Sequence, residues 1–504
     1  MSSSRADVIR FRDRVAASLR ETNSERASWG ILITDRDTGQ TLYEVNSDHF
    51  FTPASNAKLV VTALALATLG PDYKFHTTLE SNAELKDNGR LSGDLVLMGR
   101  GDPDISNRRL PYVVGAEHEG AVDRVLAEMV DQAAAGGLKQ VEGDIIADDS
   151  YFPYDPYPAD WTIGDTFFRF GAPVSAIAFN DNTISVEVMP ASHAGELATI
   201  VTQPAAAIDS FSHEINTAPS GGEPDLAVVR EPGKDFVFLR GTIPLGHEPV
   251  FLDLAMTSPG ETAALTLKQL LEARGVKVVG AAQVRHSPPP ETTASGDPVL
   301  ARPAQKTAGP PNTVLADHVS APLIEIVRVT NKISHNLHAE LLLRTVGQEN
   351  FGVGSTAAGL KIEREFLHQA GVPDGDIVLS DGSGLSREDL VTPRGIVALL
   401  RYASKQPWGA QYISTLPIAG VDGTLENRMK GTPAVGRIDA KTGEVEHVRA
   451  LSGFATTVGG ERLVFSIFYN NNPLKGTETA AAIDAVAKAM VETLGVAHPA
   501  AKPR

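Results

Sequence analysis

A serine and a lysine three residues apart, Ser55 and Lys58, form the first candidate reactive group in the sequence. They stand at the start of an apolar segment, 59–70, and Pro53 suits the first turn of a helix there. Residues three apart share one helix face, so the hydroxyl and the amine are expected to touch. A lysine whose pKa is lowered by burial or by a second cation can act as the base that makes a serine a nucleophile.

Alone, this spacing is weak, because a chain of this length should contain roughly one Ser-x-x-Lys by chance. Two further groups strengthen it. Ser334-His335-Asn336 offers a hydroxyl for proton transfer and an amide for a peptide substrate. Lys441-Thr442-Gly443 offers a cation and a hydroxyl for a carboxylate, and a glycine that lets a substrate backbone approach. Each pattern occurs once, in this order, and the conjunction indicates a single catalytic site.

Composition limits the classes of function. The 504 residues exceed one typical core and predict two or three domains. The net charge of −17 argues against nucleic-acid or anionic-membrane binding, and the absence of cysteine excludes disulfide and thiol chemistry. No apolar run is long enough to span a bilayer. The first residues lack the apolar core of a signal peptide, so we expect a cytoplasmic protein or a processed form.

The elements expected to position the three groups divide the chain into segments. Residues 29–45 read as a hairpin with a turn at 37–39, and a helix follows from Ser55. Recurrent short strands then predict an inserted β-rich region of two lobes, and a Pro-rich linker leads back to helices and a closing sheet. The predicted domains are 1–74 with 312–504 for the catalytic unit, 75–285 for the insertion and 286–311 for the linker.

A metal site is an alternative interpretation of two groups of residues. His335, His338 and Glu340 have the types of a zinc ligand set, but we expect His338 and Glu340 on a solvated helix face. Five aspartates of the inserted region fit no calcium loop, and turn or capping roles are favoured: Asp102, Asp104, Asp148, Asp149 and Asp181. These residues therefore favour no metal site.

The three motifs together resemble those of penicillin-binding proteins and class A β-lactamases. With the long insertion between the first two motifs, the chain resembles the class C low-molecular-mass penicillin-binding proteins, the D-alanyl-D-alanine carboxypeptidase/endopeptidase family. Six further stretches carry the likeness, which extends over residues 28–495: 93–97 with 101–103, 143–150, 171–176, 180–182, 318–323 and 381–386. The resemblance implies an α+β fold, a β-lactamase-like antiparallel sheet flanked by helices with a large inserted β-rich region.

The resemblance also implies a function, one that needs no metal and no organic cofactor. It implies a serine D,D-peptidase that forms an acyl-enzyme on peptidoglycan stem peptides, is acylated by β-lactams and works outside the cytoplasmic membrane. The implied catalytic residues are Ser55 as nucleophile, Lys58 as base and Ser334 as the donor of a proton to the leaving amine. Lys441 would support this proton network electrostatically, and Asn336 would bind the substrate amide. Thr442, Gly443 and Glu444 would bind substrate, with the backbone N–H groups of Ser55 and Glu444 holding the oxyanion.

Two residues depart from the family pattern. His335 stands where Asp or Asn is more usual, and we expect it to fill space. Glu444 stands where a small hydroxyl residue is usual, and a carboxylate there would disfavour the terminal carboxylate of the substrate. Two alternatives therefore stay open: a β-lactamase or esterase on the same fold, and a peptidoglycan-binding or penicillin-sensing module with weakened catalysis.

Overall fold

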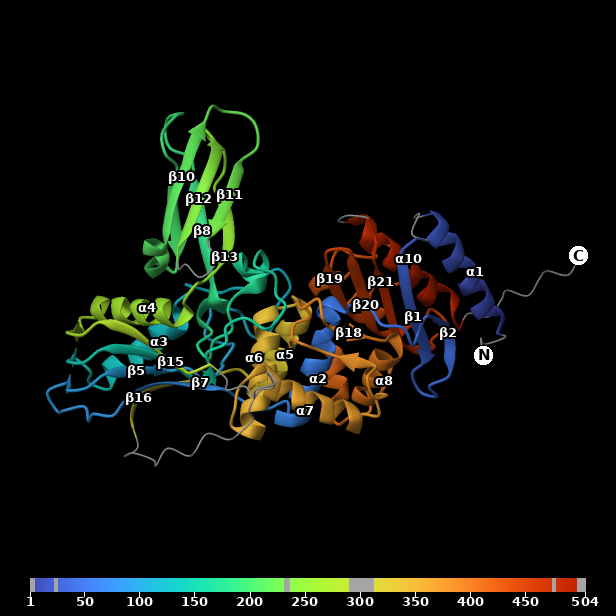
Figure 1. Cartoon of the computed structure of the whole chain (residues 1–504), viewed down its shortest axis with the longest axis horizontal. Coiled ribbons are helices and arrows are strands. Elements are labelled where there is room, and N and C mark those ends of the chain that lie inside the picture. Colours follow the sequence, from blue (N-terminus) through green and yellow to red (C-terminus); the bar gives the residue numbers. More distant parts are fainter. Residues whose placement is uncertain (1–4, 22–25, 231–235, 290–311, 474–476, 496–504) are drawn as a thin grey trace, which may run out of the picture.

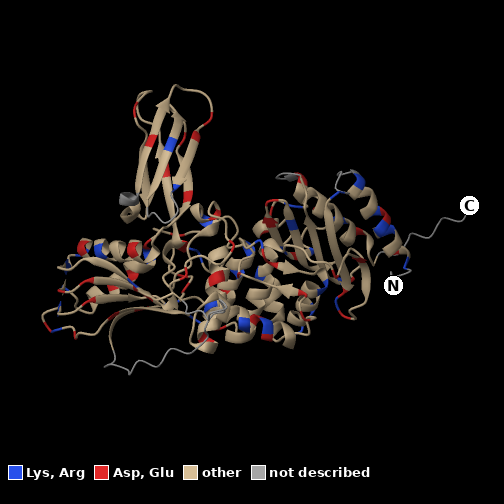
Figure 2. Cartoon of the chain, viewed as in Figure 1, with Lys and Arg blue, Asp and Glu red and all other residues tan. Residues whose placement is uncertain are grey.

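The computed structural model describes residues 5–21, 26–230, 236–289, 312–473 and 477–495. Two bodies are visible in Figure 1: one holds both ends of the described chain, and the other is built from the middle of the sequence. Basic and acidic residues are interspersed along the helices and strands of both (Figure 2). In the described ranges, no helix combines the length and the apolar character needed to cross a bilayer.

A five-stranded antiparallel sheet joins the two ends of the chain (Figure 1). Its order is β19 (Ile438–Val445), β20 (Val448–Thr456), β21 (Arg462–Asn470), β1 (Ser28–Asp35) and β2 (Thr41–Val45). The predicted hairpin is confirmed: β1 and β2 pair in antiparallel register, with Ile31 opposite Val45. β1 alternates its side chains between two apolar layers, because Ile31 and Ile33 belong to one core cluster and Leu32 to another.

Helices cover both faces of this sheet. α1 (Ala6–Glu21) and α10 (Thr477–Thr493) pack together over the face that carries Ile31 and Ile33. The other face meets a helical layer that contains the predicted helices after Ser55 and on both sides of Ser334. Its members are α2 (Ala57–Leu69), α5 (Leu323–Lys332), α6 (Asn336–Phe351), α7 (Thr356–Gln369), α8 (Pro393–Ala403) and α9 (Gly409–Ser414), with the short strands β17 (Ile377–Val378) and β18 (Leu390–Val391).

α2 lies inside this layer. Its residues 57–66 are all buried, so the helix has no solvent-exposed face over this stretch, and Lys58 and Thr62 are buried with the apolar residues. Tyr412 of α9 donates from its hydroxyl to the Leu59 carbonyl at 2.9 Å, which fixes the first turn of α2 to the layer. A helix held on every side gives its N-terminus, where Ser55 lies, a fixed position.

The middle of the sequence forms a second core. A mixed five-stranded sheet has the order β15 (Ala282–Ser287), β7 (Ile145–Pro153), β5 (Leu95–Met98), β3 (His76–Ser81) and β16 (Thr313–Val319). α3 (Arg124–Ala135) and α4 (Pro259–Ala273) belong to its core cluster, and a small sheet extends it through β14 (Lys277–Val278), β6 (Gln140–Val141) and β4 (Arg90–Leu91).

Two three-stranded sheets project from this core in Figure 1. One has the order β10 (Phe211–Ala218), β12 (Val237–Pro244) and β11 (Asp225–Arg230), and the other β13 (Val250–Ala255), β8 (Thr183–Met189) and β9 (Thr199–Gln203). Their buried side chains continue the same apolar cluster, so the projection and the α3–α4 core are packed together.

The strand β16 bears on the domain boundaries. It pairs with β3, the first strand of the middle region, although residues from 312 onward were expected in the catalytic unit. We therefore propose that the inserted region runs from about residue 75 to Val319. β15 extends to Ser287, and residues 290–311 of the predicted linker lie outside the described residues.

Candidate active site

Ser55 lies in a single 3-10 turn, η1 (Ala54–Asn56), directly before α2. Ala54 has φ +46, a left-handed conformation that costs an alanine about 1–2 kcal/mol. Two close contacts hold this turn. A Cβ on Gly384 would lie 1.9 Å from the Ala54 carbonyl oxygen, and one on Gly443 would lie 2.5 Å from the Pro53 carbonyl oxygen.

The second contact changes the reason expected for Gly443. We expected this glycine to let a substrate backbone approach, whereas here it admits the chain segment that carries Ser55. Asn56 ties the same two segments by donating from Nδ2 to the Lys441 carbonyl at 3.1 Å.

Lys58 joins the predicted groups. Its Nζ lies 2.8 Å from Ser55 Oγ, 2.7 Å from Asn336 Oδ1 and 2.6 Å from the Ser383 carbonyl oxygen. Burial lowers the pKa of Lys58 to about 7, against the opposing charges of Asp381, Glu340 and Asp389. A neutral amine has two N–H bonds and one lone pair, so it can donate to Asn336 and Ser383 while its lone pair faces the Ser55 hydroxyl.

Lys441 forms the second half of the site. It is fully buried in β19 and donates from Nζ to Ser334 Oγ at 2.8 Å. Burial and the nearby Lys58 place the pKa of Lys441 well below its usual value. Ser334, with φ +62, occupies the break between α5 and α6 that the sequence predicted.

The substrate-binding candidates surround the same opening. A cavity of about 250 Å³ is lined by both predicted serines, by the predicted residues after Lys441, and by basic residues: Ser55, Ser334, Thr424, Arg428, Thr442, Gly443, Glu444, Arg449 and Ala480. All eight predicted site residues therefore converge on one region.

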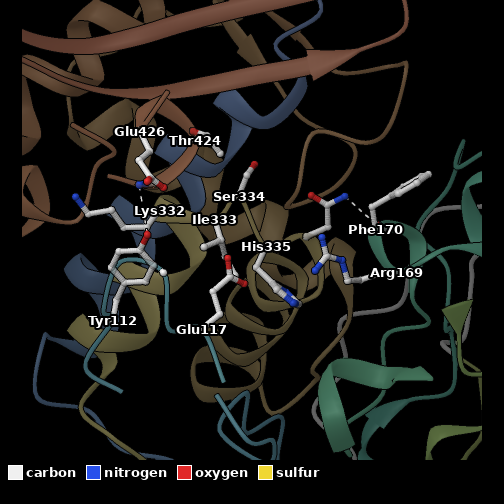
Figure 3. A pocket seen from close by; sticks show the side chains of 13 residues that line it. Tyr112, Glu117, Arg169, Phe170, Lys332, Ile333, Ser334, His335, Thr424 and Glu426 are labelled. Carbon is white, nitrogen blue, oxygen red and sulfur yellow. Dashed lines mark hydrogen bonds between the residues drawn. The ribbon is translucent and has the colours of Figure 1, made fainter. Parts of the chain in front are cut away.

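A second cavity, of about 400 Å³, shares Ser334 and Thr424 with the first (Figure 3). Its walls combine Lys332, Ile333 and Thr424 of the catalytic unit with Tyr112, Glu117, Arg169 and Phe170 of the inserted region. Phe170 also accepts a 2.7 Å hydrogen bond at its carbonyl from Asn336 Nδ2. The inserted region thus touches the second motif directly.

Glu444 is expected to repel a substrate carboxylate, but its charge is paired. Glu444 Oε1 lies 2.6 Å from Arg449 Nη2, directly across the β19–β20 ladder. This basic partner could have been sought in the sequence, since Arg449 stands five residues further on across a tight turn.

The expectation of a solvated face for His338 and Glu340 is wrong. His338 is 3% exposed and Glu340 is fully buried. Glu340 accepts the Gly382 N–H at 2.9 Å, and burial with the charge of Asp381 raises the pKa of Glu340 to about 8. His335 is also buried, where it caps α6.

Asp381 had no predicted role, although 381–386 is one of the stretches that carry the family resemblance. The Asp381 carboxylate accepts N–H bonds from Gly384 at 2.7 Å, Leu385 at 3.0 Å and Ser386 at 2.9 Å, and another from Trp161 Nε1 at 2.8 Å. The loop wraps around this carboxylate and thereby presents the Ser383 carbonyl to Lys58.

Asp381→Asn should therefore loosen the Lys58 site. An amide presents N–H to backbone N–H donors, so we expect at least one lost charge-assisted bond, about 1.5–3 kcal/mol. The melting temperature should fall and penicillin acylation should slow by about tenfold. Asp374→Asn, at an exposed carboxylate paired with His368, is the control and should change neither. An unchanged acylation rate in Asp381→Asn would contradict the role of this loop.

Comparison with known proteins identifies the family of this chain. Residues 11–491 match the D-Ala-D-Ala carboxypeptidase 3 (S13) family. The chain is 34% identical over 508 residues to a D-alanyl-D-alanine carboxypeptidase of Actinomadura sp. (strain R39), covering 99% of this chain and 87% of that protein. It is 27% identical over 451 residues to the D-alanyl-D-alanine carboxypeptidase DacB of Haemophilus influenzae, covering 88% and 86% of the two chains.

Solved structures support the fold. The crystal structure of penicillin-binding protein 4 (dacB) from Haemophilus influenzae superposes with a TM-score of 0.77 at 25% identity, covering 94% of this chain and 97% of that one. The predicted α+β fold of the penicillin-binding proteins is confirmed. The chain belongs to the D-Ala-D-Ala carboxypeptidase 3 (S13) family of serine-type hydrolases.

Proposed function

We propose that this chain removes or cleaves D-alanyl peptides of peptidoglycan through an acyl-enzyme on Ser55. The observation that carries the proposal is the environment of Lys58: a buried amine with a pKa of about 7, two fixed acceptors and its third contact on Ser55 Oγ. This arrangement leaves the amine one available lone pair, directed at the hydroxyl that must lose a proton.

Acylation begins when Ser55 Oγ attacks the carbonyl carbon of the penultimate D-alanine and its proton passes to Lys58 Nζ. The backbone N–H groups of Ser55 and Glu444 hold the oxyanion that forms; one such donor contributes about 3–4 kcal/mol. Lys441 donates to the Ser334 oxygen, so the Ser334 hydroxyl hydrogen can pass to the departing amine. Ser334 regains a proton through its bond with Lys441, and the proton that Lys58 took from Ser55 replaces the one supplied. Water then attacks the ester and releases the shortened peptide.

Binding of the substrate uses the remaining groups. Asn336 is held between Lys58 and the Phe170 carbonyl, which fixes its amide for the peptide backbone. Thr442 lines the cavity together with Arg428 and Arg449, and its Oγ1 is 2.8 Å from Thr424 Oγ1. In this proposal the terminal carboxylate of the substrate binds there. β-Lactams, whose ring carbonyl takes the place of the scissile bond, acylate Ser55. An extracytoplasmic location follows from where peptidoglycan lies.

Product analysis on defined muropeptides tests this function. We expect release of D-alanine from a pentapeptide monomer, and analysis of a cross-linked dimer measures the endopeptidase share. A fluorescent penicillin should leave a long-lived adduct. Rapid turnover of the β-lactam would favour a β-lactamase, and absence of both product and adduct would favour a binding module.

Glu444→Thr separates these alternatives further. Because Arg449 pairs with Glu444, the wild type is expected to be active. The substitution should free Arg449 and remove a negative charge near the terminal carboxylate of the substrate, which should lower KM by about 2–5-fold. A peptide ending in a D-alanine amide is the control, since it carries no terminal charge and should show no gain. Activity that appears only in the variant would instead identify a protein weakened by Glu444.

A further inference from the structure

The second motif rests on an unusual backbone. Ser334 has a left-handed φ of +62, and the next residue, His335, is the N-cap of α6. A serine in this conformation costs of order 1–3 kcal/mol and persists only where its surroundings hold it. Ser334 and Asn336, on either side of His335, both belong to the catalytic arrangement proposed above. A contact that holds His335 in place therefore also helps to position Ser334 and Asn336.

Both ring nitrogens of His335 have a polar neighbour. Its Nδ1 accepts the N–H of His338 at 3.3 Å, as an N-cap side chain does. In the neutral ring the proton then lies on Nε2, which faces Asp181 Oδ2 at 3.4 Å. The rings of His335 and His338 lie together with their centroids 4.0 Å apart.

Asp181 comes from the inserted region, in η4 (Phe179–Asn182). Its Oδ1 lies 2.9 Å from His338 Nε2, and its Oδ2 accepts from Arg108 Nε at 2.7 Å. Asp181, Arg108, His335 and His338 are at most 7% exposed. Although burial opposes its ionisation, Arg108 and His335 keep the pKa of Asp181 well below the usual value. One buried carboxylate thus meets a guanidinium and two imidazoles.

Asp181, His335 and His338 have the residue types of a zinc site, and their candidate ligand atoms lie within 4.8 Å of one another. The hydrogen bonds oppose that interpretation. Nδ1 of His335 accepts a backbone N–H, so Nε2 carries the proton and has no lone pair for a metal. Arg108 already occupies Asp181 Oδ2 and would face the added positive charge.

We infer that Asp181 is a positioning residue for catalysis: through His335 and His338, the inserted region holds Ser334 and Asn336 in the geometry that acylation needs. This rests on the proposed function. The bond from Asn336 to the Phe170 carbonyl is a second link between the same two parts of the chain. The inserted region therefore supports residues 334–336, which we call the catalytic loop, and it also lines the second cavity beside them.

A double-mutant cycle on the rate of acylation by fluorescent penicillin tests the inference. Asp181→Asn and His335→Ala should each slow acylation by about 10–100-fold, as displacement of a catalytic group by about 1 Å does. The double variant should be no slower than the slower single variant, because both changes release the same loop. Multiplied effects of the two changes would overturn the inference. Rates are taken per acylatable site, so partly unfolded material does not contribute.

Two further variants separate positioning from helix capping. His335→Asn keeps an acceptor for the His338 N–H and should preserve the melting temperature, yet slow acylation by about tenfold because the link to Asp181 is lost. Wild-type acylation in this variant would overturn the inference. His286→Ala is the matched control: this histidine contacts another buried carboxylate of the inserted region, Asp149, at 2.8 Å, and its loss should leave the rate unchanged.

Other outcomes are equally decisive. If His335→Ala yields no folded protein, the double-mutant cycle is made with Asp181→Asn and His338→Ala instead. The double variant should again be no slower than the slower single variant. Equilibrium dialysis against Zn²⁺ that finds one bound ion in the wild type and none in Asp181→Asn would replace positioning by a metal site. A wild type that penicillin does not label would refute the proposed function, whereas a labelled wild type with independent effects would refute this inference alone.

Discussion

Ser55→Ala is expected to abolish covalent labelling by fluorescent penicillin and to lower kcat/KM on a D-alanyl-D-alanine peptide by about 10⁴–10⁶-fold. The substitution removes the atom proposed to form the acyl bond, and loss of a covalent nucleophile has effects of this size in other serine hydrolases. Labelling is measured on a denaturing gel, and hydrolysis by the D-alanine released.

The fold should survive this change. Ser55 Oγ has its contact with Lys58 Nζ, while the turn around it is held by close backbone packing at Gly384 and Gly443. Ser47→Ala, which removes a hydroxyl bonded to Glu44, is the control and should label like the wild type. Full labelling of Ser55→Ala would show that another residue forms the acyl bond and would refute the proposed mechanism.

Lys58→Met should slow acylation by about 10²–10⁴-fold, the usual contribution of a positioned general base. Methionine is an unbranched side chain one atom shorter than lysine, so it fills most of the fully buried site while removing the amine. Lys268→Met, in the inserted region, is the control: it removes a lysine that donates to the Gly280 carbonyl and should leave the rate unchanged.

The pH profile gives this prediction a second readout. Only the neutral amine can take the Ser55 proton, and burial lowers the pKa of Lys58 to about 7. The wild-type acylation rate should therefore rise as the pH increases through about 7 and level off above it. In Lys58→Met this acid limb should disappear. An acid limb that survives the substitution would assign the base to another group.

Several features of this protein were open to prediction from local sequence. The hairpin of β1 and β2 follows from alternating apolar residues and its turn, and the break between α5 and α6 coincides with Ser334. The contact of Ser55 with Lys58 follows from helical spacing, because both residues lie within one turn of the chain. Short-range geometry decides each of these.

Contacts between distant segments escaped prediction. His338 and Glu340 were expected on a solvated face, but α6 is covered by the loop 381–386 and by Asp181 of the inserted region. The spacing of residues within one helix does not reveal that other segments enclose it. For the same reason Asp381 received no role, since its partners include Trp161, 220 positions away in the chain.

The amino-acid sequence by itself determined which groups this protein has for chemistry: a serine, two lysines, an amide and a hydroxyl in three motifs of fixed order. Only the tertiary structure decided the protonation states and the orientations of these groups. The pKa of Lys58 depends on burial by segments from across the chain, and Ser334 is oriented by Lys441 from the closing sheet while His335, beside it, faces Asp181 from the insertion. Residue types are local properties, whereas desolvation and hydrogen-bond direction are properties of the packed whole.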